Sequence, residues 1–113
     1  MTYLIPAQPP SPKSVGAKRI ANHTDGALSA AVGSLYKFRL TEAITVTLPE
    51  TPADGSTIDI LDALENFNTY NVTVAASGSD TIQSGGETLS DDGLSIQYVY
   101  DTATTSWRLR RVT

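Results

Sequence analysis

Apolar and polar residues alternate with a period of two along most of the chain after residue 34. Residues 36–40 read Tyr-Lys-Phe-Arg-Leu, and residues 44–48 read Ile-Thr-Val-Thr-Leu. The same alternation returns in three later segments, 57–62, 72–74 and 94–100. Successive side chains of a β-strand point to opposite faces, so this alternation predicts strands that are buried on one side.

Turn-forming residues separate these segments, most densely in the corner Leu-Pro-Glu-Thr-Pro-Ala-Asp-Gly at residues 48–55. Pro49 and Pro52 cannot donate hydrogen bonds to a strand ladder, and Asp54-Gly55 tolerates a positive φ. The turn signals recur roughly every 8–14 residues and delimit about seven or eight short strands. This spacing is typical of small all-β domains, so we predict an antiparallel β-sandwich or barrel.

Residues 1–33 lack the alternation and differ in composition. Residues 6–12 hold four of the six prolines of the chain, and proline favours extended backbone at its own and the preceding position. Ordering such a segment costs about 1–2 kcal/mol of backbone entropy per residue, which its own contacts cannot offset. We therefore predict an extended N-terminal arm over residues 1–33, used for anchoring or oligomer contacts, and a β body over residues 34–113.

Charge is distributed in three blocks, although the net charge is only −4. Residues 1–39 carry five basic residues and one acidic residue, residues 40–107 carry eleven acidic residues and no Lys or Arg, and the last six residues add three arginines. Two interpretations stay open. The basic ends pair with the acidic body of the same chain or of a neighbouring copy, or the basic arm docks on a separate acidic partner. The acidic body disfavours nucleic acid as a partner.

The arm supplies the candidate partner-binding residues of the sequence. They are Tyr3, Ile5, Pro9, Pro10, Lys13, Lys18 and Arg19.

The residue types that carry catalysis or bind metals are scarce in the sequence. The chain has one histidine, His23, and no cysteine, which disfavours a zinc site. It contains neither a GxSxG nucleophile motif nor a GK[ST] phosphate loop. A calcium site built from Asp80, Asp91 and Asp92 is the remaining metal alternative, although their spacing matches no calcium-binding loop. We therefore predict a protein that is not an enzyme, with no catalytic, cofactor-binding or metal-binding residue and no cofactor.

Aromatic residues near the C-terminus leave two interpretations open. Tyr98, Tyr100 and Trp107 either fill a core or subunit interface, or stack against a sugar. On the second interpretation Tyr98 and Tyr100 are candidate glycan contacts, together with the asparagine-rich loop at residues 66–71. No apolar run approaches the ~18 residues of a membrane-spanning helix, so no membrane partner is expected.

The order of these segments resembles that of a known family. The segments are ITVTLPETPADGSTIDILDALENFNTYNVTV, then DTIQSGG, then LSIQYVYDTATTSWRL. A strand ends in Leu-Pro, a Pro-x-Asp-Gly corner follows, and a long strand with a Tyr-Asp turn precedes a closing strand with tryptophan. This order resembles a small β module of tailed-bacteriophage virion proteins, of the capsid decoration or cement, head-fibre or tail-fibre type. The resemblance covers about residues 40–110.

The resemblance implies a structural protein of the phage virion. The expected role is a capsid decoration or cement protein that forms a homotrimer and attaches to the major capsid protein, or to another virion protein, through its N-terminal arm. It would be made in the host cytoplasm and act on the particle surface. The alternative is a tail-fibre, head-fibre or adaptor knob that binds another virion protein or a host glycan. The short chain favours decoration, because a receptor-binding fibre needs an attachment part, a shaft and a tip.

Overall fold

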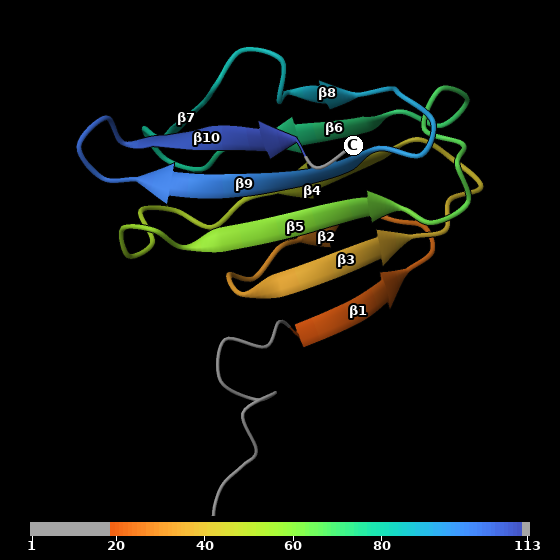
Figure 1. Cartoon of the computed structure of the whole chain (residues 1–113), viewed down its shortest axis with the longest axis horizontal. Helices are drawn as coiled ribbons and strands as arrows, with labels where there is room; N and C mark the ends of the chain where they lie inside the picture. Colours follow the sequence, from red (N-terminus) through yellow and green to blue (C-terminus); the bar gives the residue numbers. More distant parts are fainter. Residues whose placement is uncertain (1–18, 112–113) are drawn as a thin grey trace, which may run out of the picture.

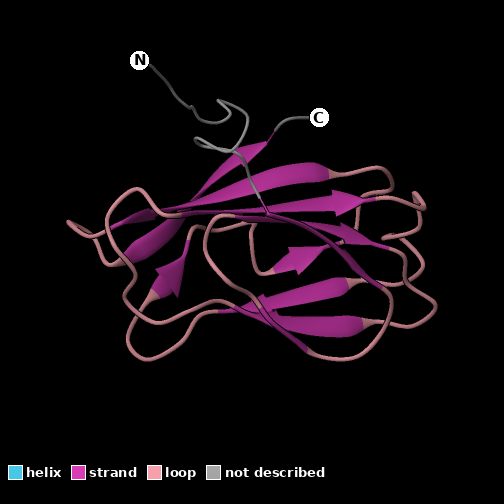
Figure 2. Cartoon of the chain, turned by 90° about the horizontal axis from the view of Figure 1, so that it is seen from below, coloured by secondary structure: helices cyan, strands magenta, loops and turns pink. Residues whose placement is uncertain are grey.

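The computed structural model describes residues 19–111, which form ten strands in two facing sheets and contain no helix. The strands are β1 (Arg19–His23), β2 (Leu28–Ser29), β3 (Ser34–Phe38), β4 (Ile44–Thr47), β5 (Thr57–Asp62), β6 (Val72–Ala75), β7 (Thr81–Ile82), β8 (Thr88–Leu89), β9 (Ser95–Asp101) and β10 (Ser106–Arg111). Figure 2 shows the two layers edge-on. The prediction of an all-β, sandwich-like fold is confirmed, with ten strands instead of seven or eight. The predicted proline-rich stretch lies outside the described residues.

The first six strands alternate between the two sheets, so the chain winds as a flattened coil (Figure 1). β1, β3 and β5 are parallel neighbours in the six-stranded sheet. β2, β4 and β6 are parallel neighbours in the four-stranded sheet. Each turn of the coil therefore adds one strand to each sheet, as in a β-solenoid.

Antiparallel strands end this stack on one side. β8 pairs antiparallel with β6, and β9 pairs antiparallel with β5. β10 returns along β9, and β7 completes the six-stranded sheet beside β10. The complete orders are β1-β3-β5-β9-β10-β7 and β2-β4-β6-β8. β1 is consequently the one edge strand longer than two residues in the described part of the chain.

The predicted antiparallel architecture is wrong for most of the strand pairs. Five of the eight pairs are parallel and three are antiparallel. Alternation reports which face of a strand is buried and is the same for both pairings. The short connections were interpreted as hairpins, but those after β3 and β5 cross from one sheet to the other.

The predicted boundary between arm and body is also wrong for residues 19–33. β1 pairs with β3, β2 pairs with β4, and Ala30 is buried in the core. These edge strands bury only small or partly covered side chains, such as Ala21 and Leu28. Their sequence therefore lacks the large alternating residues that identify the inner strands.

The core lies between the sheets and follows the predicted alternation closely. Its buried hydrophobic residues are Ala30, Tyr36, Phe38, Leu40, Ile44, Val46, Leu48, Ile58, Ile60, Phe67, Val72, Val74, Leu89, Leu94, Ile96, Tyr98, Tyr100 and Trp107. Phe67, which stands alone in a polar loop of the sequence, is fully buried with its ring centroid 6.0 Å from that of Phe38. Among residues 19–111 no helix is long and apolar enough to cross a membrane.

Candidate functional site

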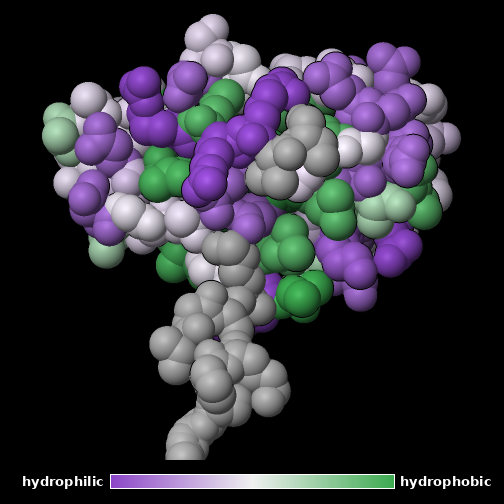
Figure 3. All heavy atoms as spheres, in the orientation of Figure 1, coloured by the Kyte–Doolittle hydropathy of each residue, from purple (hydrophilic) through white to green (hydrophobic). Residues whose placement is uncertain are grey.

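The outer face of the six-stranded sheet carries basic residues from two strands that are far apart in the sequence. Lys37 lies on β3 between the core residues Tyr36 and Phe38. Arg108 and Arg110 lie on β10, on either side of Leu109. Half-buried apolar side chains lie on the strands beside them: the register pairs Lys37 with Leu61 and Arg108 with Val99. We call this surface the basic face. Figure 3 shows hydrophobic residues interspersed with hydrophilic ones on it.

The basic residues of this face are largely unpaired within the chain. Lys37, Arg108 and Arg110 make no ion pair with another residue in the range 19–111. The described residues contain one ion pair, in which Arg111 Nη1 lies 3.3 Å from Asp91 Oδ2. Both side chains are exposed, so this pair contributes at most about 1 kcal/mol. Two carboxylates lie on the basic face: Asp59, which accepts a hydrogen bond from Gln97 Nε2 at 2.9 Å, and Asp101 at the end of β9.

The outer face of the four-stranded sheet is uncharged. Its strands present short hydroxyl side chains to the outside, in rows set by the strand register. These residues are Ser29, Thr45, Thr47, Thr73 and Thr88. The two outer faces therefore differ in kind: one carries positive charge among apolar residues, and the other is a neutral layer of hydroxyl groups.

Acidic residues lie on the loops at both ends of the sandwich, and we call the end that also carries the exposed Leu64 the acidic end. The loops meet there through hydrogen bonds, for example from Asn66 Nδ2 to the Leu40 carbonyl and from Asn68 N to Asp92 Oδ1, both at 2.9 Å. The exposed carboxylates are those of Glu42, Glu65, Asp91 and Asp92. Leu64, which is 48% exposed, lies among them.

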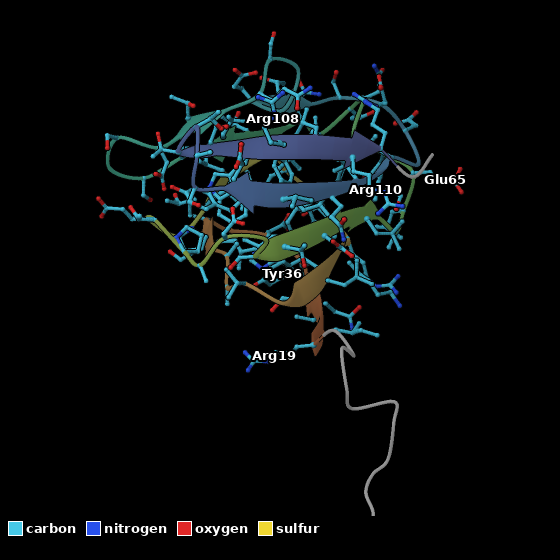
Figure 4. All side chains as sticks on the ribbon, turned by 60° about the vertical axis from the view of Figure 1, so that its left-hand side comes forward. Arg19, Tyr36, Glu65, Arg108 and Arg110 are labelled. Carbon is cyan, nitrogen blue, oxygen red and sulfur yellow. The ribbon has the colours of Figure 1, made fainter. Side chains whose placement is uncertain are left out.

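Two details describe the backbone and charge of this end. Glu65 has a φ of 54°, a left-handed conformation that strains a residue other than glycine. The hydroxyl and the backbone N–H of Thr41 donate to the carboxylate of Asp25, and they lower the pKa of Asp25. Figure 4 shows Glu65 beyond the end of the sheet and the two arginines on β10.

The prediction that Tyr98 and Tyr100 contact a glycan is wrong, because both side chains are buried, with 0% and 1% exposure. The Tyr98 hydroxyl donates to the Gly86 carbonyl, and the Tyr100 hydroxyl donates to Asp80 Oδ1. Burial raises the pKa of both phenols. Tyr100 also packs edge-on against Trp107 at 5.2 Å between ring centroids, so the core interpretation holds for these aromatic residues.

The asparagine-rich loop at residues 66–71 uses its amides to hold itself in place. Asn66 reaches the Leu40 carbonyl, and the side chains of Asn68 and Asn71 donate to the carbonyls of Ser90 and Phe67. Amides engaged in this way are not available to a sugar without breaking the loop.

The carboxylates considered for calcium do not converge. Asp80 contacts Tyr100 near the end of β9, whereas Asp91 and Asp92 precede the start of that strand. A seven-residue strand separates them by about 20 Å. Within residues 19–111 no group of three His, Asp or Glu side chains is placed to hold a metal ion.

The partner-binding residues predicted in the arm are mostly not described. Tyr3, Ile5, Pro9, Pro10, Lys13 and Lys18 lie outside residues 19–111. Arg19 is described, begins β1 and is exposed. The basic face was missed, although the signal was present: Lys37 precedes the core residue Phe38, and Arg108 follows the core residue Trp107.

No family model and no curated protein matches this chain.

Proposed function

We propose that the chain is a non-enzymatic structural protein of a tailed-phage virion, of the capsid decoration or cement type. The proposal rests on the resemblance of residues 40–110, which covers β4 to β10. It places the protein on the particle surface, attached to the major capsid protein or another virion protein, as a homotrimer. A small module that is repeated over a particle needs a fixed shape more than a reactive site.

The braced corner at residues 48–55 is the structural observation that carries this proposal. Thr51 lies at φ 43°, and its N–H donates to Asp80 Oδ2 at 2.7 Å. Gly55 N donates to the Tyr100 carbonyl at 2.8 Å, and Asp54 Oδ1 accepts from Thr102 N at 2.9 Å. The corner is therefore tied to β9 and to the turns on both sides, which suits a body that serves as a rigid building block.

Attachment through the N-terminal segment can be tested by truncation. Because β1 starts at Arg19, deletion of residues 1–18 leaves every described strand intact. We expect the truncated protein to keep the melting temperature of the full chain and to lose binding to particles that lack the protein. Full binding by the truncated protein would contradict attachment through this segment.

The virion assignment itself is tested on purified particles of the phage that encodes the chain. Mass spectrometry should detect the protein at many copies per particle, and gold-labelled antibody should decorate the whole shell in electron micrographs. Absence of the protein from the purified particles by mass spectrometry would refute the assignment, whatever the accessibility of its epitopes.

A fibre or adaptor knob is the second candidate, and the edge strand β1 favours it. β1 is five residues long, and its side chain at Ile20 is 63% exposed. Arg19 N and the His23 carbonyl bond toward the β3 side, so the alternating backbone groups of Ile20 and Asn22 face the open edge. An added strand from an elongated partner could extend the parallel stack there. Gold confined to the tail or neck would favour this candidate over decoration.

A further inference from the structure

The basic side chains on the outer face of the six-stranded sheet make no ion pair with any described residue, and this calls for a partner. The protein carries twelve acidic residues, yet Lys37, Arg108 and Arg110 pair with none of those described. We infer that the basic face of one copy binds the acidic end of a second copy. This inference rests on the surfaces of the chain itself and does not require the virion role proposed above.

The layout of the basic face suits an acidic tip with an apolar centre. β3 and β10 are separated by β5 and β9, so Lys37 lies three strand spacings, about 14 Å, across the sheet from β10, and the register displaces Arg110 and Arg108 from it by a further two and four residues along the strands. Leu61 and Val99 lie on the two strands between them and are half-buried. The register places the hydrogen-bonded Asp59 and Gln97 between Leu61 and Val99, so the apolar residue that lies between Lys37 and Arg110 is Leu61.

The acidic end has the complementary layout. Leu64 is one of three large hydrophobic side chains exposed on the described surface, and it lies at the tip of the β5–β6 loop. Glu65 follows it directly, and Glu42 and Asp92 lie on neighbouring loops. Leu64 of one copy can rest on Leu61 of the next, while the carboxylates reach Lys37 and Arg110 on the two sides of Leu61.

The two surfaces cannot satisfy one another within a single copy. One is the broad side of a sheet and the other is the end of the sandwich, as Figure 4 shows for Arg108 and Glu65. They meet within the described chain only at their shared border, where Arg111 pairs with Asp91. Because one copy contributes its face and the other its end, the contact is heterologous, and repeated association closes into a ring or continues as a filament.

Charge reversal provides the first test. We expect the full-length wild type to self-associate in sedimentation equilibrium, with an affinity that falls as NaCl rises from about 0.1 to 1 M and the Debye length shortens from about 10 to 3 Å. Arg108→Glu with Arg110→Glu should raise the dissociation constant at least tenfold, as should Glu42→Arg with Glu65→Arg. Thr45→Glu with Thr73→Glu, which places two glutamates on the neutral outer face, should leave the dissociation constant unchanged.

Mixing the two charge-reversed proteins distinguishes this contact from other modes of association. In an equimolar mixture the intact acidic end of one protein meets the intact basic face of the other, and the two reversed surfaces also carry opposite charges, so the mixture should associate although neither protein does so alone. Combining all four substitutions in one chain should restore self-association. All substituted residues are exposed, and circular dichroism with thermal melting checks that each variant is folded.

Three outcomes would overturn the inference. The wild type could remain monomeric up to about 1 mM. Association could survive both charge reversals and be lost on Ile20→Lys, which would assign it to the β1 edge. The mixture could stay monomeric although the wild type associates. None of these results bears on whether the protein occurs in virions, which the particle experiments decide separately.

Discussion

Each end of the sandwich is braced by a buried aspartate, and the two aspartates use their oxygens differently. At the corner end, Asp80 is 8% exposed and accepts from Thr51 N through one oxygen and from the Tyr100 hydroxyl through the other. At the acidic end, Asp62 is 2% exposed and accepts from Phe67 N and Gly93 N through Oδ2 alone. Oδ1 of Asp62 is buried without a hydrogen-bond partner among the described residues.

The comparison shows how the fold supports its long connections. Backbone N–H groups in a loop that packs on a core cannot use a strand ladder, and each must find another acceptor. A buried carboxylate supplies two such acceptors at once. At the corner end both acceptors are used, whereas at the acidic end one oxygen carries both hydrogen bonds and the other has none.

The largest loss of stability is expected when an aspartate is introduced into the core instead of at an end of the sandwich. Ile60 is fully buried in the middle of β5, two residues from Asp62, and its neighbours on the paired strands are the core residues Tyr36 and Ile96. We expect Ile60→Asp to leave the body unfolded at 25 °C, because burial of an unpaired charge exceeds the roughly 5–15 kcal/mol stability of a domain. Circular dichroism and thermal melting measure it. A native melting temperature would show that Ile60 does not face the core.

Removing the side chain of Asp62 or Asp80 should cause the next largest loss of stability. Asp62→Ala leaves the N–H groups of Phe67 and Gly93 without their acceptor, and we expect a loss of about 2–4 kcal/mol. Asp80→Ala should cost about 1–3 kcal/mol, because the Tyr100 hydroxyl can turn toward other acceptors. Urea denaturation of the two variants and the wild type measures both. Equal stability of all three proteins would mean that the connections do not depend on these carboxylates.

Replacing each aspartate by asparagine sharpens the contrast between the ends. Asparagine keeps one acceptor oxygen and replaces the other with an NH₂ donor. At position 62 the retained oxygen can serve both N–H groups, so Asp62→Asn should change stability by under about 1 kcal/mol. At position 80 the NH₂ group must face either the Thr51 N–H or the Tyr100 hydroxyl, and Asp80→Asn should cost about 1–2 kcal/mol. A larger loss at position 62 than at position 80 would reverse the comparison.

These braces illustrate what the sequence could and could not predict. Alternation identified the buried faces of the inner strands, because burial on one side imposes it on every strand regardless of its partner. The same local pattern carries no information about parallel pairing, so the coil of β1 to β6 was missed. Asp62 was expected only as the end of a strand and Asp80 was considered as a calcium ligand, since the groups that they accept from lie far along the chain, up to 31 residues away for Gly93.

The candidate surfaces also differ in how far the sequence could predict them. Tyr98 and Tyr100 attracted attention by residue type, but their alternation with Gln97 and Val99 already favoured the core. The basic face needed the register across four strands, which brings β3 and β10 into one surface although about seventy residues separate them. Residue type suggests chemistry along the chain, whereas the sheet order decides which residues share a surface.

The smallest change in stability is expected at Tyr100, whose phenol donates a hydrogen bond to Asp80. Burial, and then the hydrogen bond to Asp80, raise the pKa of Tyr100 above the 10.0 of an exposed tyrosine. In this pH range the unfolded chain releases protons that the folded chain retains, so stability is fully present below pH 10.0 and falls as the pH rises beyond it. Tyr100→Phe should lower the urea midpoint slightly at pH 7, where only the hydrogen bond is lost. Above pH 10 its stability should fall less steeply than that of the wild type, because one buried phenol fewer resists ionisation. Parallel slopes of urea midpoint against pH in the two proteins would show that Tyr100 ionises as readily in the folded chain as in the unfolded chain. The corner end would then lack the tightly buried phenol that distinguishes it from the acidic end.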